Sequence, residues 1–176
     1  YYGKTEIVVC DSYEDLGRTA ARDVSTTLRG LLESQQEVRM IFAAAESQAT
    51  FLDALALERG LDWSRVVCFN MDEFWGPGLP ESVTCIHQLK RQLYDKVRPK
   101  AWHVPAYHAP DADAEADRFE AAFKAHQPID ILCQGIGRSG HLALNEPGIT
   151  HFDDPRSVRV VDICEASMKQ LRDDPN

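Results

Sequence analysis

Residues 38–70, VRMIFAAAESQATFLDALALERGLDWSRVVCFN, contain two apolar runs separated by an amphipathic segment. The runs at 38–45 and 65–70 predict two strands. The segment at 47–59 predicts a helix, and Gly60 directly after it is typical of a helix end. A strand, a helix and a second strand joined by short connections indicate a parallel β-α-β unit.

The same alternation continues on both sides of this unit. Further elements are predicted as strands at 5–10, 129–134 and 157–163, a short extended piece at 102–106, and helices over 13–34, 82–97 and 111–126. Asp11 or Ser12 can cap the first of these helices, and Asp111 lies near the start of the last. We therefore expect an α/β fold with a doubly wound, mostly parallel sheet that helices cover on both faces.

The length and the charge restrict the class of protein. A chain of 176 residues suits one domain with a sizeable core, so we expect a single domain over residues 1–176. The net charge of -9 gives an acidic surface that repels nucleic-acid phosphates and anionic lipids, which argues against both as partners. No apolar run approaches the ~20 residues of a membrane helix, and the N-terminus does not have the pattern of a signal peptide.

The cysteines indicate the redox setting. The sequence has five, and they are Cys10, Cys68, Cys85, Cys133 and Cys164. They are scattered and form no C-x-x-C pair, which argues against a disulfide framework and against a zinc site. A reducing, cytoplasmic setting fits this pattern best.

Three loops are candidates for the functional site. In open sheets of this kind, ligands bind beyond the carboxyl ends of the strands. The loops that follow predicted strands there are AAAESQAT (43–50), NMDEFWGPG (70–78) and GIGRSGHLALNEPG (135–148). These loops also hold most of the residues with useful chemistry.

The loop at 135–148 is the richest in such residues. Its three glycines allow tight turns and a close approach of the backbone to a ligand, and they are Gly135, Gly137 and Gly140. Their spacing does not match a dinucleotide-binding fingerprint. His141 beside the carboxylate of Glu146 can move protons near neutral pH, and Asn145 shares a face with His141 if the segment forms a helical turn. A glycine-rich turn with a structural histidine explains the same spacing equally well.

The other two loops also allow two interpretations. Asp72 and Glu73 follow a buried strand and can supply a general base, or they can be turn residues or caps of the next helix. In the first loop, Ser47, Thr50 and free backbone N–H groups at a helix start can hold an anion. An ordinary helix cap is the alternative there.

Two of the loops resemble the motifs of a known family. FNMDEFWG (69–76), followed by Glu81-Ser82, is similar to the pattern F-N-M-D-E-Y-x-G and E-S-Y of the glucosamine-6-phosphate deaminase/isomerase family. GIGRSGHLALNEPG is similar to its G-I-G-x-D-G-H-I-A-F-N-E-P-G, and the likeness covers roughly residues 5–174. The resemblance implies a Rossmann-like fold of the glucosamine-6-phosphate deaminase or ribose-5-phosphate isomerase type.

The resemblance also implies a reaction and a set of site residues. Family members open the ring of glucosamine 6-phosphate and convert it to fructose 6-phosphate and ammonia, without a metal or a redox cofactor. By position, Asp72 would move the proton between C2 and C1, His141 would assist ring opening, and Glu146 would orient His141. The residues implied to contact the sugar phosphate are Ser47, Gln48, Thr50, Glu73, Gly137, Ser139, Gly140 and Asn145.

This sequence departs from the family pattern at three places. Ser139 replaces an aspartate, Phe74 replaces a tyrosine, and AAAESQAT replaces a Gly-Gly-Ser/Thr phosphate loop, although a divergent branch has a similar A-A-A-x-S-Q loop. Relatives also continue for several dozen residues, so we expect the single domain to lack the C-terminal part of the family fold. Since relatives are often oligomers, the resemblance implies a homo-oligomer as well.

Two other functions fit parts of the pattern. A 6-phosphogluconolactonase-like hydrolase shares the fold and a G-x-G-x-D-G-H loop, but the segment ALNEPG (143–148) favours the deaminase. A sensor domain that binds a sugar phosphate without catalysis is consistent with Ser139 and the altered phosphate loop. The sequence contains no visible helix-turn-helix segment that would join such a sensor to DNA.

Overall fold

The computed structural model describes residues 3–137, 139–146, 148–151, 153–165 and 167–169. Its strands are β1 (Val38–Phe42), β2 (Val66–Asn70), β3 (Ala101–His103) and β4 (Ile131–Cys133). Its α-helices are α1 (Tyr13–Ser34), α2 (Ala49–Leu57), α3 (Cys85–Leu89), α4 (Asp95–Val97) and α5 (Ala112–Ala125). Short 3-10 turns are η1 (Glu46–Gln48), η2 (Trp63–Arg65) and η3 (Glu81–Val83), and η4 (Lys90–Tyr94) is a π-helical segment between α3 and α4.

The described strands form one sheet in the order β3-β2-β1-β4, and every pair is parallel. In the register of β1, Val38 lies opposite Val66 and Met40 lies opposite Ile131. All carboxyl ends therefore meet at one edge of the sheet. The predicted parallel α/β fold is confirmed.

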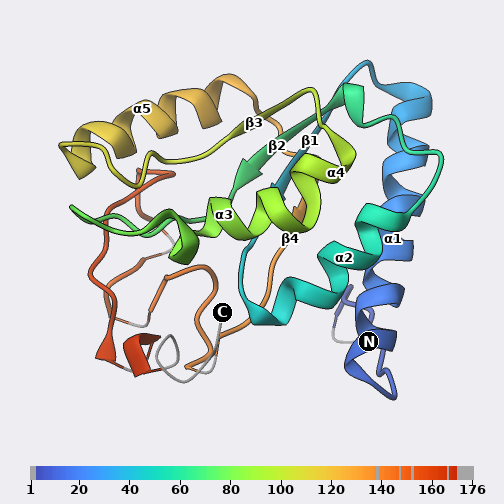
Figure 1. Cartoon of the computed structure of the whole chain (residues 1–176), viewed down its shortest axis with the longest axis horizontal. Helices are drawn as coiled ribbons and strands as arrows, with labels where there is room; N and C mark the ends of the chain where they lie inside the picture. Colours follow the sequence, from blue (N-terminus) through green and yellow to red (C-terminus); the bar gives the residue numbers. More distant parts are fainter. Residues whose placement is uncertain (1–2, 138, 147, 152, 166, 170–176) are drawn as a thin grey trace.

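Helices cover both faces of this sheet, with α1 and α2 on one side and α5 on the other (Figure 1). Side chains of β2 alternate between the two cores: Cys68 packs with α1, α2 and α3, whereas Phe69 packs with Phe119 of α5. Every residue of β2 is buried. This burial on both faces explains the nearly continuous apolar run that predicts the strand.

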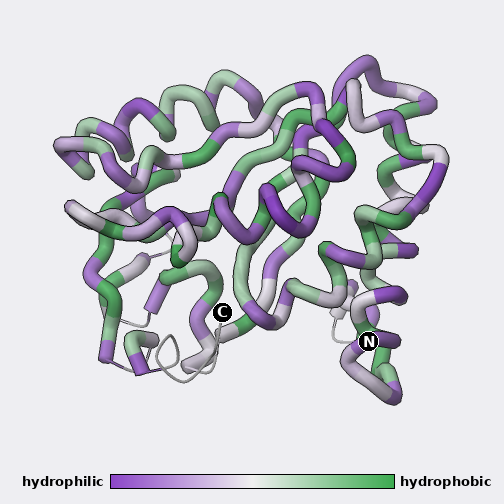
Figure 2. Tube along the Cα trace, in the orientation of Figure 1, coloured by the Kyte–Doolittle hydropathy of each residue, from purple (hydrophilic) through white to green (hydrophobic). Residues whose placement is uncertain are grey.

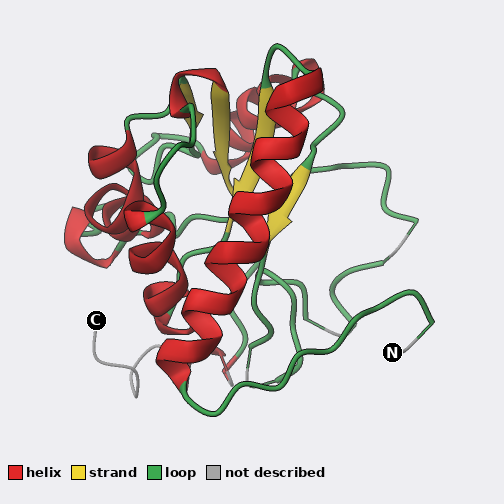
Figure 3. Ribbon diagram, turned by 90° about the vertical axis from the view of Figure 1, so that its right-hand side faces the viewer, coloured by secondary structure: helices red, strands yellow, loops and turns green. Residues whose placement is uncertain are grey.

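The helix α1 has the bounds predicted from the sequence. Ser12 is its cap, and its hydroxyl oxygen accepts a hydrogen bond from the backbone N–H of Asp15 at 3.1 Å. Hydrophilic and hydrophobic residues alternate along the helix (Figure 2), which runs across the sheet (Figure 3), and its buried apolar residues share one core with those of β1 and β2. Asp111 caps α5 in the same way, with its carboxylate accepting from the N–H of Ala114 at 3.0 Å.

Two predicted strands are wrong. Residues 5–10 form no strand, and the side chains of Ile7, Val8 and Val9 are exposed. Residues 157–163 are also without strand structure. Both segments have apolar, β-branched residues, but a strand also needs a neighbouring strand whose backbone groups it can pair with.

The remaining differences concern element ends. The helix predicted over 82–97 begins at Cys85 and is interrupted by η4, and the helix predicted over 47–59 already ends at Leu57. Gly60 lies in the turn that follows, at a φ of +74°. Among the described helices, none is long and apolar enough to cross a membrane.

Candidate active site

The site lies at the carboxyl edge of the sheet, where the loops after β1, β2 and β4 meet. Gly135, just after β4, lies against the loop after β1: an added Cβ there would be 2.9 Å from Gln48 Nε2 and 3.0 Å from Ser47 Oγ. The loop after β2 is tied to β1 by a hydrogen bond from Met71 N–H to Phe42 O at 2.9 Å. The three candidate loops therefore surround one region.

Asp72 follows β2 and is held at the start of α3. The thiol of Cys85 donates a weak hydrogen bond to Asp72 Oδ1 at 3.8 Å. Burial raises the pKa of Asp72 to about 6, against the lowering effects of the Cys85 thiol and of the nearby charge of His141. A carboxylate with a pKa near neutrality is well suited to take up and return a proton.

Glu73 anchors the loop that carries Asp72. Its carboxylate accepts hydrogen bonds from the backbone N–H groups of Phe74 (2.9 Å), Cys85 (2.8 Å) and Ile86 (2.9 Å). The last two N–H groups lie in the first turn of α3 and have no partner within the helix. The structure thus selects the helix cap among the roles that the sequence leaves open for Glu73, and it places Asp72 beside that cap.

His141 and Glu146 form the second group of the site. Glu146 is only 7% exposed, and its Oε1 lies 2.9 Å from His141 Nδ1. Ser139 Oγ lies 2.7 Å from the same nitrogen and 2.9 Å from Glu146 Oε2. The hydroxyl at the position of the family's aspartate therefore bridges the histidine and the glutamate.

The glycines around His141 have specific roles. An added Cβ on Gly137 would lie 2.1 Å from His141 Nε2, so a larger residue would displace the imidazole. Gly140 N–H donates to Gly137 O at 2.9 Å, and Gly140 has a φ of +87°, a conformation that favours glycine. Glycine at these positions lets the backbone wrap closely around the histidine.

Two residues of this cluster are not among the site residues predicted from the sequence. The Ser167 hydroxyl donates to Glu146 Oε1 at 2.6 Å, and the Cys164 thiol donates to the same oxygen at 3.0 Å. Hydrogen bonds from Ser167 and Cys164, then that from Ser139 and the charge of His141, lower the pKa of Glu146 to about 2. The sequence gives no signal for Ser167 or Cys164, because only the folded chain brings them to a loop some 20 residues earlier.

The predicted residues of the first loop divide into two groups. Ser47 and Gln48 face Gly135 of the loop after β4. Thr50 instead connects α2 to α1: its hydroxyl donates a hydrogen bond to Tyr13 O at 3.1 Å, and it packs directly on Gly17 of α1. Thr50 thus supports the position of α2, while Ser47 and Gln48 lie at the meeting point of two loops.

Asn145 does not share a helical face with His141. The segment 142–145 is a tight turn in which Asn145 N–H donates to Leu142 O at 3.0 Å and Ala143 has a φ of +54°. The amide Nδ2 of Asn145 also donates to Leu142 O, at 2.9 Å. The condition of a helical turn is therefore not met, and Asn145 stabilises the turn that leads to Glu146.

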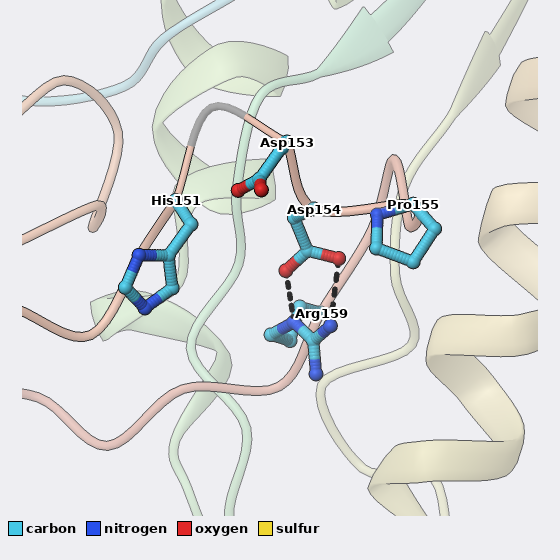
Figure 4. A pocket seen from close by; sticks show the side chains of 5 residues that line it. All are labelled: His151, Asp153, Asp154, Pro155 and Arg159. Atoms are coloured by element: carbon cyan, nitrogen blue, oxygen red, sulfur yellow. Dashed lines mark hydrogen bonds and ion pairs between the residues drawn. The ribbon is translucent and has the colours of Figure 1, made fainter.

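Two depressions lie near these loops. One of about 240 Å³ lies beyond β2 on the α5 side and is lined by Phe69, Phe119, Asn145 and neighbouring residues. The other, of about 400 Å³, is open and is lined by His151, Asp153, Asp154, Pro155 and Arg159 (Figure 4). There Arg159 donates two hydrogen bonds of 2.7 Å to Asp154, so the pair neutralises its own charge. Neither lining includes Asp72 or His141, which are brought together by loop contacts.

The arrangement contains two separate groups that have the chemistry to transfer protons. Asp72 is a partly buried carboxylate with a pKa of about 6, and the charge of His141 reaches it. His141 is in turn held by an ionised Glu146. Over the described part of the chain, no group of three or more His, Cys, Asp or Glu side chains is arranged to hold a metal.

The sequence and the fold both match proteins of known name. The profile of the family described as glucosamine-6-phosphate isomerases/6-phosphogluconolactonase matches residues 11–170. A glucosamine-6-phosphate deaminase of Arthrobacter sp. (strain FB24) is 33% identical over 150 residues, which are 81% of this chain and 55% of the relative. A glucosamine-6-phosphate deaminase of Streptococcus suis (strain 05ZYH33) is 35% identical over 132 residues, which are 75% of this chain and 54% of the relative.

Solved structures agree on the fold. A monomeric glucosamine-6-phosphate deaminase superposes with a TM-score of 0.82 at 22% identity, over 94% of this chain and 68% of that protein. A 6-phosphogluconolactonase of Shewanella baltica OS155 gives 0.68 at 17% identity, over 76% of this chain and 57% of that protein. The chain spans about half the length of the curated relatives that it matches. Since the family profile covers most of the sequence, the chain belongs to the family of glucosamine-6-phosphate isomerases and 6-phosphogluconolactonases.

Proposed function

We propose that this chain converts glucosamine 6-phosphate and water to fructose 6-phosphate and ammonia. The observation that carries the proposal is the pairing of a carboxylate of raised pKa, Asp72, with a separate His141–Glu146 pair in the adjoining loop. The family and the names of the relatives support the same reaction. In keeping with the free cysteines, we place the reaction in the cytoplasm.

The proposed chemistry divides between the two groups. His141 transfers a proton between the ring oxygen and the anomeric hydroxyl, which opens the sugar to its aldehyde. Asp72 then removes the proton from C2 while the C1 oxygen is protonated, and it returns a proton to C1. This shift oxidises C2 to an imine and reduces C1 to an alcohol. Water hydrolyses the imine to the ketone and releases ammonia.

We assign the surrounding residues to binding and positioning. Ser47 and Gln48 face the region between the loops and are proposed to contact the phosphate. The backbone of Gly137 and Gly140 is proposed to contact the sugar, beside His141. Glu73, Thr50, Asn145 and Ser139 would act on the substrate through the loops and side chains that they hold.

The test measures both products and both family reactions. Purified protein is mixed with glucosamine 6-phosphate, and ammonia and fructose 6-phosphate are measured together. A second assay follows hydrolysis of 6-phosphogluconolactone, since the family also includes that activity. Equal amounts of ammonia and fructose 6-phosphate are expected. Lactone hydrolysis without ammonia release would contradict the proposal.

The change Asp72→Asn tests the proton-transfer role. It should reduce kcat by at least about 1000-fold with little change in binding, because the amide has nearly the same shape but cannot accept the proton. Asp23→Asn, on the exposed side of α1, is the matched control and should behave like the wild type. Turnover by Asp72→Asn at the wild-type rate would exclude Asp72 as the base.

A further inference from the structure

The oxygen Oε1 of Glu146 is surrounded by more donors than the other oxygen of the same carboxylate. It lies 2.9 Å from His141 Nδ1, 2.6 Å from Ser167 Oγ and 3.0 Å from Cys164 Sγ. Ser139 Oγ is within 3.0 Å of it as well. The shortest of these contacts is the one from Ser167, whose residue is only 4% exposed.

The hydrogen-bond partners in this cluster indicate which ring nitrogen of the neutral His141 carries the proton. The ionised carboxylate of Glu146 can only accept hydrogen bonds. Ser139 and Ser167 each have one hydroxyl proton, and each oxygen lies within 3.0 Å of the carboxylate, to which it can donate. The oxygens of both serines also face His141 Nδ1, at 2.7 and 3.2 Å, and can accept from it when their own protons are donated to Glu146. Since Glu146 Oε1 lies 2.9 Å from Nδ1 and cannot donate to it, we assign the proton of the neutral His141 to Nδ1, which leaves Nε2 free.

We infer that Ser167 is a positioning residue for His141: its hydroxyl holds Glu146 against Nδ1, so that the free Nε2 stays on the substrate side of the ring. The inference rests on the proposed function, because it gives His141 the proton-transfer role. The close approach of Nε2 to Gly137 fits this orientation, since it is the glycine that leaves room at that nitrogen. Ser167 lies 26 residues after His141, so the C-terminal segment of the described chain takes part in the site.

The test compares Ser167→Ala with two variants that keep a donor, Ser167→Thr and Ser167→Cys. Ser167→Ala should lower kcat for glucosamine 6-phosphate about 10- to 100-fold and leave KM nearly unchanged, because a buried hydrogen bond to a charged group is lost. At least one of the two donor-retaining variants should recover most of the rate. Ser64→Ala is the matched control, because Ser64 also donates a 2.6 Å hydrogen bond to a carboxylate, that of Asp62, at the opposite end of β2.

A second measurement needs no substrate. Nitrogen-15 NMR of the His141 ring distinguishes a proton on Nδ1 from one on Nε2. The wild type should show the Nδ1–H form, and Ser167→Ala should show a mixture of the two forms. A wild type without deaminase activity but with this NMR result would refute the proposed reaction and support the role of Ser167.

Two results would overturn the inference. One is a wild-type ring protonated on Nε2. The other is a Ser167→Ala protein with unchanged kcat and an unchanged ring form. A loss of rate that neither Thr nor Cys restores, accompanied by a lower Tm and an unchanged ring form, would also overturn it, since a purely structural role predicts that combination.

Discussion

The two loops that carry the proposed proton-transfer groups are held in different ways. The loop after β2 is fixed by one side chain, Glu73, which accepts hydrogen bonds from backbone N–H groups no more than 13 residues away. The loop after β4 is fixed by side chains bonded to Glu146, and Ser167 reaches it from 21 residues away. Half of the site is therefore built within one local β-α unit, and the other half depends on a distant segment.

The first prediction disrupts the loop after β4. Gly137→Ala should lower kcat about 100-fold or more, because the new methyl group would overlap His141 Nε2 and shift the ring. The rate of turnover checks this. Gly30→Ala is the control, since an added Cβ there meets no other atom, and it should keep full activity. Full activity of Gly137→Ala would mean that the ring can move without loss of function.

The second prediction disrupts the loop after β2. Glu73→Gln should lower kcat about 10-fold and the free energy of unfolding by about 1 kcal/mol, because an amide offers one acceptor oxygen to three N–H groups. Urea unfolding and turnover are measured on the same samples. Glu14→Gln, on the exposed surface of α1, should leave both values unchanged. If Glu73→Gln keeps the kcat and the free energy of unfolding of the wild type, the cap is not needed to hold Asp72.

The third prediction compares how the two carboxylates affect stability as pH changes. The pKa of Asp72 is raised from 3.8 to about 6, so the folded chain binds more protons than the unfolded chain between these values. Its ionisation thus costs stability as pH rises through that window. The pKa of Glu146 is lowered from 4.5 to about 2, so its contribution to stability is present above 4.5 and is lost as pH falls toward 2.

Neutral variants should therefore shift stability in opposite directions. Near pH 7, Asp72→Asn should be more stable than the wild type by about 1 kcal/mol or more, whereas Glu146→Gln should be less stable than the wild type. Both differences should shrink as pH falls, because the wild-type carboxylates then become protonated. Urea unfolding at several pH values measures this, with Asp23→Asn as the control. A shift in the same direction for both variants would contradict the assigned environments.

Most of the fold could be predicted because its signals are local. Periodicity and a capping serine give α1 its bounds, and the apolar runs of β1 and β2 reflect burial in the sheet. The strands predicted at 5–10 and 157–163 are wrong because strand formation depends on a partner that composition does not reveal.

The site was predictable to the extent that its residues lie in the loops after strands. The rule that ligands bind at the carboxyl edge of such sheets indicates the loops, and the resemblance to the family motifs selects Asp72, His141 and Glu146 within them; their roles stay predictions. The role of Glu73 cannot be predicted without the position at which α3 begins, since only that position brings the N–H groups of Cys85 and Ile86 to its carboxylate. Ser167 and Cys164 could not be found, because their contacts with Glu146 exist only in the folded chain.

The strand order determines how far apart the loops that carry Asp72 and His141 begin. The loops of Asp72 and His141 follow β2 and β4, which flank β1, and the loop after β1 provides Ser47 and Gln48 between them. Neighbouring strands lie about 4.8 Å apart, so the bases of the outer loops are separated by about 10 Å. This span is set by backbone hydrogen bonds and cannot change when loop residues mutate. The sheet therefore fixes the distance between the starting points of these two loops, and only the loop residues determine what lies between them.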